Sequence, residues 1–166
     1  MNPVAEENNL IVDRQGRSFR NLRISLTAAC NYACTYCVPD GKRLQAAAYE
    51  LGAQEMIQAV RLLIATAGID KVRITGGEPL VRKNILWLFR ALSRHLETGV
   101  LEELTLTTNG SQLRKYAAEL AACGVKRINV SLDTLDPAKF AEITRWGRLP
   151  QVLDGIEAAK AAGMQV

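Results

Sequence analysis

The chain has 166 residues, of which 48% are hydrophobic and 23% charged, and its formal net charge is +4 at pH 7. This composition is ordinary for a globular domain with a sizeable core, and it excludes a disordered, collagen-like or disulfide-dominated chain. No apolar run is long enough to span a membrane, and the first ten residues lack the apolar core of a secretory signal. The mild, evenly spread positive charge suits an anionic ligand but argues against nucleic acid as a partner.

Residues 1–13 are expected to form a flexible N-terminal tail, and residues 14–166 a single core domain. Strand-like segments follow in the order 22–27, 71–75, 104–108 and 127–132. Apolar stripes with helical spacing separate or follow them at 56–67, 85–96, 113–120 and 152–159. Four strand–helix units in succession predict an α/β fold with a parallel sheet and right-handed crossovers.

The predicted strands alternate apolar and polar side chains, as Leu22, Ile24 and Leu26 do with the residues between them. Strands buried on both faces would instead read as continuous apolar runs, and a closed barrel would fill its interior with branched apolar side chains. We therefore expect an open, partial β/α barrel whose polar concave face holds a polar ligand. An antiparallel sheet with one wet face is the alternative, and the helical segments between the strands argue against it.

Three of the four cysteines crowd into one short segment directly after the first predicted strand, as Cys30, Cys34 and Cys37. Cysteines this close cannot form a disulfide framework, so we expect metal binding or catalysis in a reducing, cytoplasmic environment. Ligands of β/α architectures bind at the carboxyl ends of the strands, where this loop lies. A structural zinc ion needs four ligands, whereas a [4Fe–4S] cluster on three cysteines keeps one iron open for chemistry. A zinc site completed by another chain, or cysteines buried by chance, are the alternatives.

The C-x3-C-x2-C spacing, with an aromatic residue before the last cysteine, resembles the signature of the radical S-adenosylmethionine (SAM) enzymes. The resemblance implies a [4Fe–4S] cluster on the three cysteines, with its open iron chelated by SAM. It also implies that a 5′-deoxyadenosyl radical abstracts a hydrogen atom from the substrate.

The same resemblance assigns SAM contacts to five residues outside the cysteines: Tyr36, Gly76, Gly77, Glu78 and Ser131. The two glycines and Glu78 belong to the segment GGEP, which follows the second predicted strand. Taken alone, Gly-Gly before proline is more often only a turn. Ser131 on its own is equally well read as a strand hydroxyl that faces a wet interior.

Four strings of the sequence narrow the resemblance: LRISLTAACNYACTYCVPDG, KVRITGGEPLVR, LTLTTNG and INVSLDTLDP. They resemble the N-terminal half of the GTP 3′,8-cyclase family of molybdenum cofactor (molybdopterin) biosynthesis, over about residues 14–166. This implies a lyase that cyclises GTP to (8S)-3′,8-cyclo-7,8-dihydroguanosine 5′-triphosphate, with GTP contacts at Arg23, Arg73 and Thr107.

The polar strand face gives these GTP contacts physical support. A triphosphate is well matched by guanidinium groups, and an arginine that points into a barrel is costly unless an anion meets it. The alternative is that Arg23 and Arg73 pair with internal carboxylates such as Asp133 or Glu78.

The sequence also departs from the family. The family's C-terminal three-cysteine cluster site and its glycine tail have no counterpart here, and Cys123 reads as a small core residue. Residues 164–166 read as the start of a fifth strand, so we expect a fragment of a longer protein, truncated after about four βα units. Trp146, in the loop before the last helical segment, is read equally as part of a lid or as a solvated turn.

The resemblance implies GTP as the small-molecule substrate, an electron donor such as a flavodoxin or ferredoxin, and a homodimer as one oligomeric state. Two alternative functions stay open. One is a radical SAM enzyme with a different substrate, such as a peptide maturase. The other is a non-catalytic, truncated domain that binds a cluster or a partner through its open edge.

Overall fold

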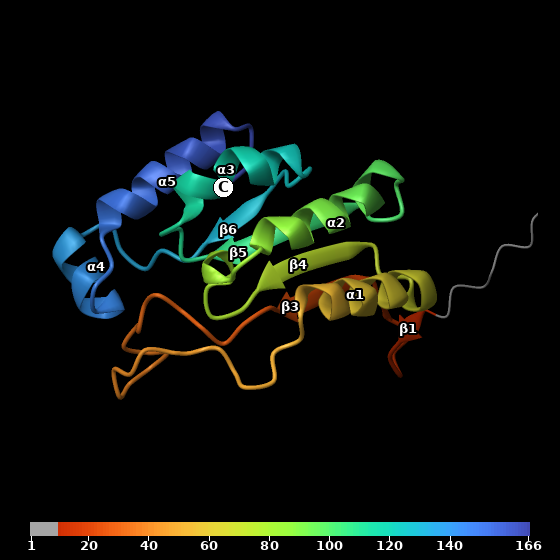
Figure 1. Ribbon diagram of the computed structural model, residues 1–166, viewed down its shortest axis with the longest axis horizontal. Helices are drawn as coiled ribbons and strands as arrows, with labels where there is room; N and C mark the ends of the chain where they lie inside the picture. The colour runs from red at the N-terminus through yellow and green to blue at the C-terminus, as the bar shows by residue number, and fades with distance from the viewer. Residues whose placement is uncertain (1–9) are drawn as a thin grey trace, which may run out of the picture.

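The computed structural model describes residues 10–166 and confirms an α/β fold built on a parallel sheet. Its four strands are β3 (Asn21–Ser25), β4 (Lys71–Thr75), β5 (Glu103–Thr108) and β6 (Ile128–Val130). They are all parallel and lie side by side in chain order, as Figure 1 shows. This order is the open, partial barrel expected from the sequence.

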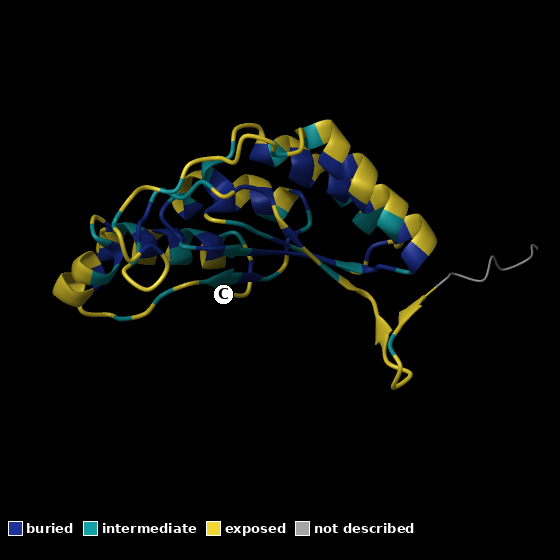
Figure 2. Ribbon diagram, turned by 90° about the horizontal axis from the view of Figure 1, so that it is seen from below, coloured by how far each residue is buried: buried dark blue, intermediate teal, exposed yellow. Residues whose placement is uncertain are grey.

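Helices connect the strands and follow the last one: α1 (Ala53–Ala67), α2 (Ile85–Glu97), α3 (Leu113–Ala122), α4 (Pro137–Thr144) and α5 (Leu149–Ala161). A short 3-10 helix, η1 (Pro79–Val81), follows β4. Right-handed crossovers between sequential parallel strands place their helices on one face of the sheet. Figure 2 shows this arrangement, with the buried sides of the helices turned towards the sheet. The other face of the sheet is left free for a ligand.

The alternation of the strands sorts their side chains between the two faces. One row of register partners, Ile24, Ile74, Leu106 and Ile128, crosses all four strands and belongs to the main hydrophobic core. The neighbouring row, Arg23, Arg73 and Thr105, lies on the opposite face because successive side chains of a strand point to opposite sides. The predicted polar face is therefore present, with arginines next to each other in adjacent strands.

The strand predicted at 127–132 is shorter than expected and ends at Val130. After it the chain leaves the sheet for α4, which begins at Pro137 with the Asp136 side chain capping its first turn. The sequence pattern did not indicate this helix. At the other edge of β6, Arg127 and Gln165 form a parallel bridge, which is the beginning of the fifth strand expected at 164–166.

The N-terminal region contains a hairpin that the sequence analysis did not identify. Strand β1 (Ile11–Val12) pairs antiparallel with β2 (Ser18–Phe19), and Figure 2 shows the hairpin projecting from the body of the molecule. The boundary expected after residue 13 falls inside its turn, and residues 1–9 of the expected tail lie outside the described residues. Within residues 10–166 no helix combines the length and the apolar character needed to cross a bilayer.

Candidate active site

A cavity of about 230 Å³ opens at the carboxyl ends of the strands, and we call it the cysteine cavity. All three clustered cysteines line it. Of the other residues expected at the site, it is lined by Arg23, Tyr36, Gly76, Gly77, Thr107 and Ser131. Residues far apart in the sequence therefore meet at one place, as the strand-end positions of the motifs predicted.

The cysteine loop, residues 30–37, turns sharply between its second and third cysteines. The backbone N–H groups of Cys37 and Val38 both donate to the carbonyl oxygen of Cys34, at 2.9 and 2.8 Å. Cys30 and Cys34 are half-buried and Cys37 is exposed. Burial raises the pKa of the Cys30 and Cys34 thiols, so in the free chain these two favour the protonated form. Metal binding replaces those protons.

The donor set suits an iron–sulfur cluster better than a single metal ion. Among residues 10–166 no three Cys, His, Asp or Glu side chains come close enough together to hold one ion. In a cluster each thiolate binds a different iron atom, so the cysteine sulfurs must be spread around the cluster. The three cysteines, which line one cavity, meet this requirement. Cys123 lies in the main core at the end of α3 and is 5% exposed, which confirms that it is a packing residue.

The cysteine loop is held from outside by the segment that ends α4, and Figure 1 shows the long loop after β3 running below that helix. The Arg145 guanidinium donates to the carbonyl oxygens of Ala33, Val38 and Pro39, at 3.2, 3.4 and 3.0 Å. Arg145 has a φ of 70°, which is uncommon for a residue other than glycine and points to a tertiary constraint.

Two further contacts complete this clamp on the cysteine loop. The indole N–H of Trp146 donates to the carbonyl oxygen of Asn31, so Trp146 lies in an exposed bend, as one of the two predicted alternatives has it, but is attached to the cysteine loop. The Tyr32 and Phe140 rings pack edge to face with their centroids 6.1 Å apart, an arrangement worth about 0.5–1.5 kcal/mol beyond burial. These contacts join the loop to α4.

The glycines of the GGEP segment let it pack directly against the backbone of residues 27–29. Gly77 N–H donates to the Thr27 carbonyl at 2.7 Å, and a Cβ atom on Gly77 would lie 2.3 Å from the Ala29 carbonyl oxygen. Gly76 has a φ of 154°, which side chains other than glycine rarely allow. Both glycines thus bring backbone to the wall of the cysteine cavity.

Glu78 does not line the cysteine cavity, although the family resemblance assigned it to SAM. Its side chain is completely buried and accepts hydrogen bonds from three donors, Leu80 N, Thr108 Oγ1 and Asn109 N, of which the last two belong to residues that line the cavity. Burial raises the pKa of Glu78, while these hydrogen bonds favour its ionised form and oppose the shift. The structure gives this carboxylate a role in supporting the strand ends, and its contact with SAM stays a prediction.

Tyr36 and Ser131 both line the cysteine cavity. Tyr36 is 64% exposed, and its hydroxyl donates to Asp133 Oδ2 at 3.1 Å. Burial of the hydroxyl is the largest influence that raises its pKa. Ser131 is exposed, and its backbone N–H donates to the Thr108 carbonyl at 2.9 Å. Both side chains are accessible to a ligand in the cavity.

The two predicted GTP arginines lie next to each other on β3 and β4. Arg23 lines the cysteine cavity and also a neighbouring cavity of about 280 Å³, which Arg73 lines as well. We call this second one the arginine cavity. Among residues 10–166, neither guanidinium forms an ion pair, which excludes the predicted alternative of pairing with Asp133 or Glu78 within this part of the chain.

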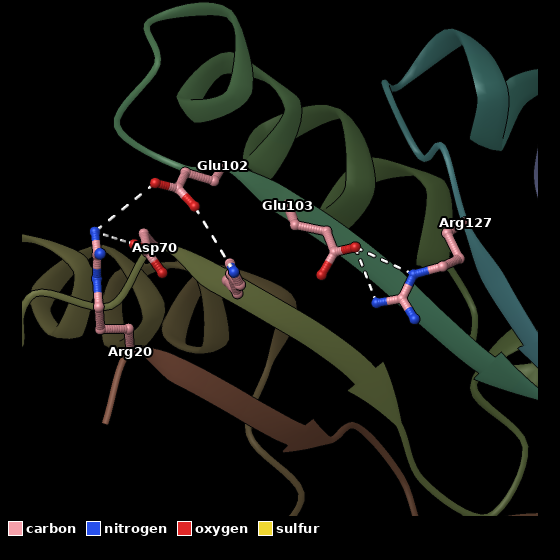
Figure 3. A network of polar contacts seen from close by, with 6 residues as sticks. Arg20, Asp70, Glu102, Glu103 and Arg127 are labelled. Atoms are coloured by element: carbon pink, nitrogen blue, oxygen red, sulfur yellow. Dashed lines mark hydrogen bonds and ion pairs between the residues drawn. The ribbon is translucent and has the colours of Figure 1, made fainter. Parts of the chain in front are cut away.

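Three carboxylates near the amino ends of the strands are paired with other basic side chains, as Figure 3 shows. Asp70 pairs with Arg20, and Glu102 lies 3.8 Å from both Arg20 and Lys71. Glu103 accepts from Arg127 at 2.9 Å. Glu103 lines the arginine cavity but is paired with Arg127, and Asp133 in the cysteine cavity accepts from Tyr36, so neither strand arginine has an ion-pair partner among residues 10–166.

Several residues of the site were not singled out from the sequence. Asn109 follows β5 and contacts the cysteine loop, and Arg145 clamps that loop from outside. The position of Asn109 just after a strand end was an available signal, because ligand-binding residues gather there. For Arg145 the sequence carries no comparable signal, since its contacts depend on how α4 packs.

Residues 24–166 match the Radical SAM superfamily, so the chain belongs to the radical SAM superfamily. That superfamily uses a [4Fe–4S] cluster and SAM, which fits the three cysteines around one cavity.

The chain also resembles particular members. It is 54% identical over 165 residues to a GTP 3′,8-cyclase of Bradyrhizobium diazoefficiens, and the aligned region covers 99% of this chain and 48% of the relative. It is 55% identical over 156 residues to a GTP 3′,8-cyclase of Paracoccus denitrificans, covering 94% of this chain and 45% of the relative. The chain thus spans about half the length of the curated relatives it matches.

A solved structure shows the same fold. Streptococcus suis SuiB bound to S-adenosylmethionine superposes with a TM-score of 0.67 at 22% sequence identity, over 87% of this chain and 32% of that one. At this identity the likeness supports the fold alone.

Proposed function

We propose that this chain forms the SAM-binding and nucleotide-binding part of a GTP 3′,8-cyclase of molybdenum cofactor biosynthesis, with residues 14–166 as its core domain. The observation that carries the proposal is the arginine pair beside the cysteine cavity. Arg23 and Arg73 are in register on adjacent strands, and neither forms an ion pair with a carboxylate among residues 10–166. Identity above 50% to curated GTP 3′,8-cyclases supports the same substrate.

The chemical roles divide between the two cavities. Cys30, Cys34 and Cys37 would hold the cluster, which together with SAM supplies hydrogen abstraction when bound. The walls of the cysteine cavity, including Gly76 and Gly77, would hold SAM through close backbone approach. The arginine cavity would take the triphosphate, and Arg23 would contribute to both because it lines both.

Electrostatic attraction favours a triphosphate at the two arginines. Neighbouring like charges on adjacent strands repel, and each guanidinium can form two parallel hydrogen bonds to phosphate oxygens. A bound triphosphate therefore relieves the repulsion and satisfies the donors together. Thr107, which lines the cysteine cavity together with Arg23, would contact the nucleoside part.

GTP binding to the chain, measured by calorimetry, tests the substrate. Arg23→Ala and Arg73→Ala should each weaken GTP binding by roughly tenfold or more, since a hydrogen bond to a charged group is worth about 1.5–3 kcal/mol. Arg114→Ala is the matched control, because Arg114 lies on α3 and pairs with Asp154. Equal GTP affinity in all three variants would contradict the proposal and favour a different radical SAM substrate.

The cluster is tested by electron paramagnetic resonance of the chain after anaerobic reconstitution and reduction. A [4Fe–4S]⁺ signal that changes when SAM is added is the expected result. Serine replacement of any of the three cysteines should abolish that signal, whereas Cys123→Ser should leave it intact. A folded chain that shows no cluster signal would count against the three-cysteine assignment.

We further propose a cytoplasmic enzyme that takes its electron from a flavodoxin- or ferredoxin-type donor and forms a homodimer. The exposure of Cys37 supports electron transfer at this loop, because it places one cluster ligand at the surface. Reduction of the reconstituted cluster by purified flavodoxin tests the donor, and sedimentation equilibrium tests the dimer. Failure of the flavodoxin to reduce a cluster that dithionite reduces would exclude that donor.

A further inference from the structure

Asn109, which follows the end of β5, connects the GGEP segment to the cysteine loop. Its backbone N–H donates to Glu78 Oε2 at 2.6 Å. Its side-chain amide nitrogen lies 2.9 Å from Asn31 Oδ1 and 3.9 Å from Cys30 Sγ. Asn109 is half-buried and lines the cysteine cavity. It therefore contacts the first cysteine from the side of the sheet.

The orientation of the Asn109 amide is fixed by its neighbours. The backbone N–H of Ser111 can only donate, and it lies 3.0 Å from Asn109 Oδ1. The Ser111 hydroxyl donates to the same oxygen at 2.7 Å. Gln151 Nε2 donates to the carbonyl oxygen of Ser111 at 2.8 Å and so fixes the position of Ser111. Because the oxygen must face Ser111, the amide nitrogen must face Asn31 and Cys30.

We infer that Asn109 is a positioning residue that donates an N–H···S hydrogen bond to Cys30 and so raises the reduction potential of the cluster bound there. Reduction adds one electron to the cluster, and part of the added negative charge falls on the cysteine sulfurs. A donor aimed at a sulfur stabilises the reduced form more than the oxidised form, and such hydrogen bonds are among the determinants of cluster potentials. The Tyr32 N–H, 3.4 Å from the same sulfur, acts in the same direction.

This inference rests on the three-cysteine cluster of the proposed function but is independent of the substrate. Its test is an electrode titration of the reconstituted chain without GTP, followed by electron paramagnetic resonance. Asn109→Leu keeps the branched shape and removes the donor. Asn109→Asp keeps an acceptor for Ser111 and replaces the donor with a carboxylate oxygen.

Both variants should shift the potential to more negative values, and the aspartate variant further because it adds negative charge. For the leucine variant we expect a roughly tenfold change in the ratio of oxidised to reduced cluster, which is about 59 mV for one electron. Asn129→Leu is the matched control, because Asn129 is half-buried on β6 and lines neither cavity. A potential that Asn109→Leu and Asn109→Asp leave unchanged would overturn the inference.

A second measurement needs no cluster. In the nuclear magnetic resonance spectrum of the metal-free chain, the side-chain amide signals of Asn109 should move when Cys30 is changed to alanine. They should stay in place in Cys123→Ala. Signals insensitive to Cys30→Ala would overturn the hydrogen bond itself. A chain that assembles no cluster at all would instead refute the cluster assignment, and the amide signals would still decide on the hydrogen bond.

Discussion

Replacing Glu78 with glutamine tests whether its carboxylate supports the strand ends or contacts a ligand directly. The carboxylate is completely buried and accepts from Leu80 N at 3.0 Å, Thr108 Oγ1 at 2.7 Å and Asn109 N at 2.6 Å. Glutamine keeps one oxygen but turns an NH2 group towards at least one of these donors. One hydrogen bond is lost and a buried N–H or O–H is left without an acceptor, at a cost of about 1–3 kcal/mol.

Denaturation of the cluster-free chain in urea, followed by circular dichroism, measures this cost. For a chain of this size, about 1–3 kcal/mol corresponds to a fall in melting temperature of roughly 2–12 °C. Glu119→Gln is the control, because Glu119 is a surface residue that pairs with Arg90, and its replacement should change stability by less than about 0.5 kcal/mol. If Glu78→Gln is as stable as the parent but binds SAM more weakly, the carboxylate contacts the ligand and our reasoning is refuted.

Three further predictions concern the same site. Because burial raises the pKa of Glu78 above its ordinary value of 4.5, the folded state holds this proton more tightly than the unfolded state. The free energy of unfolding should therefore fall as pH rises above 4.5. A series of urea denaturations at different pH values should show a shallower fall for Glu78→Gln than for the parent. An equal pH dependence in both chains would contradict the raised pKa of Glu78. Gly77→Ala should lower the free energy of unfolding by about 3 kcal/mol, because its Cβ atom would clash with backbone. Gly99→Ala should lower it by about 1–2 kcal/mol, because only the positive φ of Gly99 disfavours a side chain there. Equal melting temperatures of the two variants would argue against the close packing at Gly77. Arg145→Ala should lower the free energy of unfolding by about 1–3 kcal/mol and speed amide hydrogen exchange in the cysteine loop. Arg148→Ala is the control, because Arg148 is exposed and its replacement should change neither quantity. Unchanged hydrogen exchange in Arg145→Ala would exclude the clamp.

Local patterns in the sequence were sufficient to predict the sheet and the position of the cysteine cavity. The strand at 71–75 was placed correctly because Val72 and Ile74 alternate with polar residues over its whole length. The spacing of Cys30, Cys34 and Cys37 directly after a strand placed them at the carboxyl end of the sheet. Both inferences use only residues close together in the chain.

Features that depend on tertiary packing could not be predicted. Helix α4 has eight residues and buries only Phe140 and Thr144, which is too few apolar positions for a periodic signal. The direction of the Glu78 side chain depends on donors thirty residues further along the chain, at Thr108 and Asn109. The GGEP motif identifies Glu78 as important, but it does not distinguish support of the strand ends from contact with a ligand.

The clamp on the cysteine loop has a consequence for the order of folding. Each strand pairs with the one before it, and the paired residues are at most 50 positions apart in the chain, as Asn21 and Lys71 are. The bond from Arg145 to Ala33 instead spans 112 residues, and contacts this distant form late because a long loop must be closed first. During synthesis the three thiols therefore stay on an unclamped loop beside a sheet that is already forming. In that interval Cys30, Cys34 and Cys37 would be accessible for assembly of a cluster, since Arg145 and Trp146 reach the loop only when α4 docks.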